Sequence, residues 1–166
     1  TTPSGPPGGW AMAEEGVDLA TTERASALTR GWNLIEAQPD RLLLAQTDAD
    51  TGLEVRRLFS FGPADNVLRL ETWVRSPESR RTLARIGLLD VRVEGEHFRE
   101  TGTAPASFPA FGQRLFAGIE HVSGECRVLE EAADRLQLTH RPRTEVGADW
   151  HPIATAVLGW PQPGVG

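Results

Sequence analysis

The sequence of 166 residues contains no lysine and no tyrosine, so arginine supplies all 17 of its basic side chains. Without lysine the chain can form neither a Schiff base with a carbonyl substrate nor a Walker-type phosphate loop, and without tyrosine it has no phenolic acid. A single cysteine, Cys126, excludes an internal disulfide. No run of about 18 apolar residues is present, which excludes a transmembrane helix and argues against a membrane partner.

The charge balance narrows the classes of partner further. There are 23 acidic residues against 17 basic ones, which gives a formal net charge of −6 and an isoelectric point near 5.2. A negatively charged protein is repelled by phosphate backbones, so nucleic acid is not expected as a partner. The length is that of one domain, which buries roughly 70 % of its unfolded surface. The composition assigns the chain to no compartment.

Both ends are rich in proline and glycine. Residues 1–9 lack the basic and then apolar order of a signal peptide, and we expect them to form a flexible linker. Residues 160–166 have the same character and are expected to form a flexible tail, which leaves 10–159 as a single domain. The chain does not begin with methionine, and together with these ends this suggests an excised part of a larger protein.

Between the ends, short strands and turns dominate the pattern. Residues 53–61 and 67–74 alternate between apolar and polar types around a turn and predict an antiparallel hairpin, with a slip at 56–57 that indicates a bulge. A second hairpin is predicted from 126–129 and 136–140. We therefore expect a mainly β protein, an antiparallel β-sandwich with at most one or two short helices. The core candidates of the first hairpin are Leu53, Val55, Leu58, Leu68, Leu70 and Val74.

Two segments are candidates for helix. Residues 14–30 are the best of them, although their apolar spacing is poor. Ser76 and Pro77 resemble a helix start, but a polar connection into a strand over 83–93 is the favoured alternative. Gly87 and the apolar run after it support the strand.

Glu120 and His121 form the most suggestive pair for chemistry. A carboxylate beside an imidazole can serve acid–base catalysis, with His97 as an alternative partner. Neighbours in a strand point to opposite faces, however, so an ordinary structural role competes with this reading. The sequence therefore predicts no confident catalytic residue.

Metal and cofactor sites have little support. The four histidines, at 97, 121, 140 and 151, lack a compact metal-binding spacing. Cys126 has the apolar surroundings of an inert buried thiol. The acidic turn that begins at Asp48 lacks the remaining ligands of a calcium loop. We expect no metal and no cofactor.

Five tryptophans offer flat apolar faces on which sugar rings can stack, although packing is the commoner role of this residue. Trp73 lies in a strand whose Leu70 and Val74 are expected to point elsewhere. We therefore expect the Trp73 side chain to face a groove or a second sheet.

The segments 53–59, 66–74 and 113–121 resemble the N-terminal β-supersandwich domain of α-galactosidase-type glycoside hydrolases, which has the galactose-mutarotase-like fold. The segment 113–121 is similar to that family's phenylalanine–x–glycine–x–glutamate–x motif. Family members usually have proline at the position of Val122 and often at that of Arg114. The resemblance implies a non-catalytic domain beside a separate catalytic barrel, with Gly118, Glu120 and His121 near the domain interface or the rim of a sugar site.

Three functions stay open on these grounds. The favoured one is a non-catalytic accessory domain of a carbohydrate-active enzyme, which binds glycan weakly, through Trp73, Gly118, Glu120 and His121, or packs against an adjacent catalytic domain. The second is a small stand-alone sugar epimerase, mutarotase or lyase that uses Glu120 and His121. The third is a protein-interaction sandwich without sugar affinity, and exposed edge strands would also permit a homo-oligomer.

Overall fold

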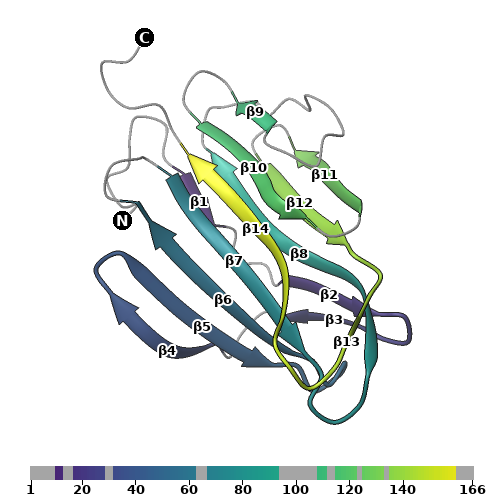
Figure 1. Ribbon diagram of the computed structural model, residues 1–166. Coiled ribbons are helices and arrows are strands. Elements are labelled where there is room, and N and C mark those ends of the chain that lie inside the picture. The colour runs from purple at the N-terminus through teal and green to yellow at the C-terminus, as the bar shows by residue number, and fades with distance from the viewer. Residues whose placement is uncertain are drawn as a thin grey trace.

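The computed structural model describes residues 10–12, 17–28, 32–62, 67–93, 108–111, 115–122, 125–132 and 135–159. Within these residues the protein is all-β, with two antiparallel sheets and no helix (Figure 1). The expected antiparallel, mainly β sandwich is thus confirmed. No helix in these ranges is long and apolar enough to span a membrane. The predicted linker 1–9, the predicted tail 160–166 and His97 lie outside the described residues.

Sheet A consists of β1 (Trp10–Met12), β2 (Val17–Thr21), β3 (Ala25–Leu28), β8 (Arg81–Val93), β11 (Glu125–Ala132), β12 (Arg135–Arg141) and β13 (Thr144–Val146). Its main order is β11-β12-β8-β2-β3, and β1 and β13 also pair with β8. The 13-residue β8 is therefore the strand on which this sheet is assembled. The predicted hairpin of 126–129 and 136–140 is confirmed as β11 and β12.

Sheet B consists of β4 (Asn33–Gln38), β5 (Arg41–Thr47), β6 (Glu54–Phe61), β7 (Val67–Arg75), β9 (Phe108–Phe111), β10 (Leu115–Val122) and β14 (His151–Gly159). Its order is β4-β5-β6-β7-β14-β10-β9, so four consecutive strands form a meander before β14 returns beside β7. The predicted hairpin of 53–61 and 67–74 is confirmed as β6 and β7.

The alternation along β7 explains why this segment is a strand and which face it buries. Leu68, Leu70, Thr72 and Val74 are buried on the inner face, whereas the residues that alternate with them are half-buried on the outer face. Each fully buried leucine contributes about 1.5–3 kcal/mol of hydrophobic stabilisation. The opposing sheet supplies the fully buried Leu83 and Ile86 from β8, so both sheets contribute to one core.

Three expectations from the sequence are wrong. Residues 17–21 and 25–28 pair as a hairpin of two strands instead of forming a helix. The register of β6 is continuous on both sides, so there is no bulge at 56–57, and uninterrupted alternation places Leu58 on the outer face instead of in the core. After Ser76 the chain continues through residues 77–80 into β8 without a helix, so the favoured polar connection is confirmed and the helix start is ruled out.

Arg57 lies on the inner face of β6, at a position where an apolar residue is usual. Its side chain is 5 % exposed, and its Nη2 donates a hydrogen bond to the backbone oxygen of Gly87 in β8, which links the two sheets. Its guanidinium also lies over the ring of Trp32, 5.8 Å from the centroid. Burial lowers the pKa of Arg57 to about 10, so it remains charged at neutral pH.

A second polar link joins the sheets at the turn between β5 and β6. Asp48 accepts hydrogen bonds from the backbone nitrogen of Thr51 at 2.9 Å, from the Thr51 hydroxyl, and from Ser26 Oγ at 2.8 Å, which closes the turn and ties it to sheet A. Burial alone would raise the pKa of Asp48, but the hydrogen bonds from Thr51 and Ser26 outweigh it and lower the pKa. Gly52 completes this turn at a φ of 72°, a left-handed conformation that glycine adopts without strain.

Candidate functional site

An open pocket of about 490 Å³ lies at one end of sheet B. Residues 76–80, which connect β7 to β8, form one wall, and residues 147–151, which lead into β14, form the other. The lining includes the carboxylates of Glu78 and Asp149, the imidazole of His151 and the indole of Trp150. Acceptors, donors and one flat apolar ring thus meet in a single hollow.

Ser76 anchors the two walls to each other. Its backbone nitrogen donates a hydrogen bond of 2.7 Å to the Gly147 oxygen, and its hydroxyl donates to the Ser79 oxygen within its own wall. Ser76 is 2 % exposed, so both bonds are shielded from water. The base of the pocket is consequently held by buried hydrogen bonds, although its walls come from distant parts of the chain.

Two arginines hold the indole of Trp150 in place. The guanidinium carbon of Arg75 lies 4.5 Å from the ring centroid, and that of Arg56 lies 5.0 Å from it. Both distances are within the range of cation–π attraction. Arg75 is itself fixed by Glu54, whose Oε2 lies 2.5 Å from its Nε.

Trp73 belongs to the same outer face as Trp150. In the strand register Trp73 lies opposite Arg56 on one side and Pro152 on the other. Because His151 pairs with Val74, Trp150 comes one step further along, beside Arg75. Of the two surroundings expected for Trp73, a groove or a second sheet, the second sheet is wrong, since this face of β7 points away from sheet A.

The sequence-predicted pair at 120 and 121 lies in β10, next to β14. Ile119 pairs with Ala156 and Val122 pairs with Ala154, so Glu120 and His121 together oppose a single residue in a β-bulge. The regular alternation assumed from the sequence is interrupted at this point. Gly118 pairs normally with Val157.

Trp73 and the bulge lie on strands that are not adjacent, because β14 separates β7 from β10. The bulge opposes Thr155, which pairs with Glu71, so it lies two strand spacings across the sheet and two residues of β7 along it from Trp73. Gly118 is level with Arg69 and lies further along. The structure thus places these residues on one sheet and does not bring Gly118, Glu120 and His121 next to Trp73. The side chains of Glu120, His121 and Cys126 lie outside what the structure describes.

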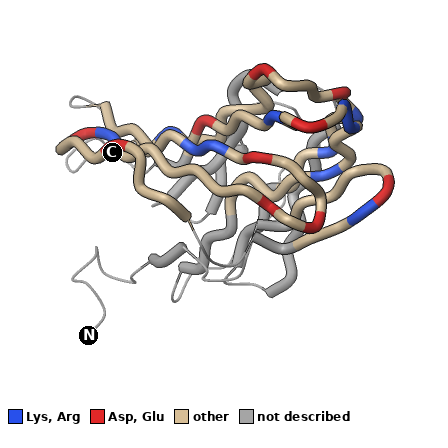
Figure 2. Tube along the Cα trace, turned by 90° about the horizontal axis from the view of Figure 1, so that it is seen from below, with Lys and Arg blue, Asp and Glu red and all other residues tan. Residues whose placement is uncertain are grey.

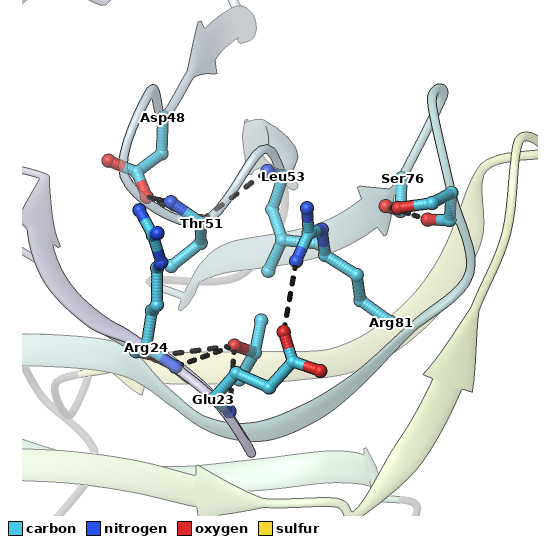
Figure 3. A network of polar contacts seen from close by, with 9 residues as sticks. Glu23, Arg24, Asp48, Thr51, Leu53, Ser76 and Arg81 are labelled. Atoms are coloured by element: carbon cyan, nitrogen blue, oxygen red, sulfur yellow. Dashed lines mark hydrogen bonds and ion pairs between the residues drawn. The ribbon is translucent and has the colours of Figure 1, made fainter.

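A smaller pocket of about 120 Å³ shares Arg80 with the first and lies against sheet A. Here Arg81 Nη1 lies 3.6 Å from Glu23 Oε2, and Arg80 Nη1 lies 3.4 Å from Glu145 Oε1. Figure 3 shows Arg81 reaching towards Glu23 beside the Asp48 turn. Each cation of this pocket already has a carboxylate partner, so the pocket is a structural junction.

Metal-binding and nucleic-acid-binding features are not seen among the described residues. No group of three or more metal-ligating side chains is found there. Charges of both signs are interspersed along the same part of the chain instead of forming a basic stripe (Figure 2). Asp48, at the start of the turn that has a weak likeness to a calcium loop, uses both its oxygens for internal hydrogen bonds.

No protein-family model matches the chain, and no curated protein is significantly similar to it.

The pocket itself was not predicted from the sequence. In the sequence, Trp150 is one of five tryptophans and His151 one of four histidines, and nothing local distinguishes either of them. The available signal was the polar segment 147–151 directly before a strand, together with the proline-containing segment 76–80 directly after one. Only the pairing of β14 with β7 brings these two segments together.

Proposed function

We propose that this protein is a non-catalytic accessory β-sandwich domain of a carbohydrate-active enzyme and that it binds glycan weakly at one end of sheet B. The observation that carries the proposal is the position of Trp73 and Trp150 on one outer face beside the 490 Å³ pocket. Indole faces suit the C–H faces of sugar rings, and carboxylates and imidazole suit their hydroxyl groups.

The binding surface combines a stacking area and a polar hollow. Trp73 and Arg56 form the stacking area on β7 and β6, and the pocket adds Glu78, Asp149 and His151 as hydrogen-bonding groups. The segment 113–121, which resembles part of a supersandwich domain, includes β10 of the same sheet, and this resemblance supports a site on sheet B. A short open surface of this kind favours weak, reversible binding.

Ligand-observed NMR of the purified chain tests the proposal. The panel holds galactosides, glucosides and their oligomers, and saturation transfer to at least one of them is expected. Trp73→Ala should reduce the transfer, whereas Trp32→Phe serves as the matched control because Trp32 contacts the interior Arg57. Silence across the whole panel, or equal transfer with the Trp73 variant, would refute binding at this face.

A second candidate function is contact with another protein, and the edge strand β4 favours it. Leu34 and Ile35 on this strand are 60 % and 56 % exposed. An edge strand with exposed apolar residues can pair with a strand of a second copy. Light scattering over a range of concentrations checks this: a dimer that Ile35→Lys disrupts would support it, and a monomer at every concentration would remove it.

A further inference from the structure

The three arginines around the pocket differ in how their charges are compensated. Arg75 is paired with Glu54 at 2.5 Å, and Arg80 is paired with Glu145 at 3.4 Å. Arg56 has no carboxylate partner among the described residues, and its contact there is with the ring of Trp150. Arg56 therefore contributes an uncompensated positive charge to the outer face of sheet B.

The cation–π contact with Trp150 leaves the hydrogen-bond donors of Arg56 available. An aromatic ring attracts a guanidinium through the charge distribution on the ring face and supplies no lone-pair acceptor for its N–H groups. Those groups form a fork that matches the two oxygens of a carboxylate. Trp150 thus positions Arg56 for an anion without occupying its donors.

Trp73 lies directly opposite Arg56 in the β6–β7 register. Side chains of directly opposed residues on one face of an antiparallel pair have Cβ atoms about 4.5–5.5 Å apart. A sugar ring stacked on the Trp73 indole would therefore lie within reach of the Arg56 guanidinium. In a hexuronic acid the carboxylate is attached directly to the ring, so a single sugar unit can satisfy both side chains.

We infer that the glycan bound at this face is acidic, with a uronate carboxylate held by Arg56 while its ring stacks on Trp73. This inference rests on the proposed glycan-binding function and specifies its ligand class. The net charge of −6 does not oppose it, because charges further away than about 8 Å are screened at physiological ionic strength. Arg56 is thus a specificity-determining residue, and Trp73 is the stacking platform.

The experiment compares acidic oligosaccharides with neutral partners of the same shape. Oligomers of galacturonate, glucuronate and mannuronate are titrated into the chain by calorimetry, each beside its methyl ester, and sulfated oligosaccharides form a third arm. We expect at least one acid to bind about tenfold more tightly than its ester, because a charge-assisted fork is lost on esterification. Added salt should weaken the binding of the acid and leave that of the ester unchanged.

Arg56→Gln should abolish the difference between acid and ester. The matched control is Arg41→Gln, because Arg41 is opposite Ser60 on the same outer face, four residues or roughly 13 Å along β6 from Arg56. Thermal unfolding of both variants checks that they fold. If Arg41→Gln and Arg56→Gln lower the affinity equally, general charge attraction explains the result and the inference is wrong.

The remaining outcomes separate this inference from the proposed function. Equal binding of acid and ester that still depends on Trp73 would overturn the acidic ligand and leave glycan binding intact. Tighter binding of sulfated sugars than of uronates would overturn the assignment to a carboxylate. The absence of binding in every arm would refute both the inference and the function on which it rests.

Discussion

The buried Arg57 should make this protein more stable in alkaline solution, which is unusual. A charge that is moved from water into the interior between the sheets is disfavoured, and this lowers the pKa of Arg57 to about 10. The lowering corresponds to about 3 kcal/mol of unfavourable free energy while the group is charged. The folded state loses the proton before the unfolded state does, so the penalty decreases as the pH rises through about 10.

The magnitude follows from the two pKa values. Below about pH 9 both states are protonated, and stability does not depend on this group. Between about pH 9 and pH 11 the free energy of unfolding should rise by about 1 kcal/mol. The chain contains no lysine and no tyrosine, so the other side chain that ordinarily titrates near this range is the thiol of Cys126, and a Cys126→Ser background removes its contribution.

Urea unfolding, followed by tryptophan fluorescence with a reducing agent present, measures this dependence. Arg57→Met should remove the rise and, at pH 7, increase the free energy of unfolding by about 1–2 kcal/mol, since the buried charge is lost along with one hydrogen bond. Arg56→Met is the matched control, because Arg56 precedes Arg57 and lies on the outer face. If the free energy of unfolding of the wild type stays constant or falls between pH 9 and pH 11, as is expected for Arg57→Met, the reasoning is refuted.

Three further predictions concern turns. Asp48→Ala should lower the free energy of unfolding by about 2–3 kcal/mol, because three hydrogen bonds to a carboxylate are lost. Since the pKa of Asp48 is lowered in the folded state, its stabilising contribution is present above the unfolded pKa near 3.9 and is lost as the pH falls. In urea titrations, the stability of Asp48→Asn should therefore depend less steeply on acid pH than that of the wild type. Gly52→Ala should cost about 1–2 kcal/mol at φ 72°, and calorimetry should show a Tm lower by about 2–8 °C; an unchanged Tm would contradict the strain argument. Arg143→Gly should raise the Tm by about 1–3 °C, because Arg143 has a φ of 48°, and a lower Tm would mean that its side chain contributes more than the strain removes.

The hairpin of β6 and β7 could be predicted because its signal is local. Alternating polarity on both sides of a short turn specifies two strands and the face that each buries. The face on which Arg57 lies could not be predicted, because a charged residue at an inward position interrupts the apolar–polar alternation and resembles a β-bulge. Its hydrogen-bond partner, the Gly87 oxygen, belongs to the other sheet and is 30 residues away in the sequence, so no local pattern indicates the contact.

The hairpin of β2 and β3 and the pocket could not be predicted for the same physical reason. β2 and β3 are too short to show a period, and β2 is completed by pairing with β8, far along the chain. The pocket depends on the hydrogen bond between Ser76 and Gly147, which come from segments that are distant in sequence. Trp73 remains a predicted ligand-binding residue, and the position of Arg56 opposite it follows only from the strand register.

The pairing of β8 determines the order in which the protein can fold. β4 to β7 pair with their immediate neighbours in sequence, so this meander closes only short loops. β8, in contrast, must collect β1 and β2 from one end of the chain and β12 and β13 from the other, which requires the closure of long loops and is slow. In pulsed hydrogen exchange during refolding, the amides of β5 to β7 should therefore be protected before those of β2, and the Arg57 contact with Gly87 can form only when the late sheet docks on the early one.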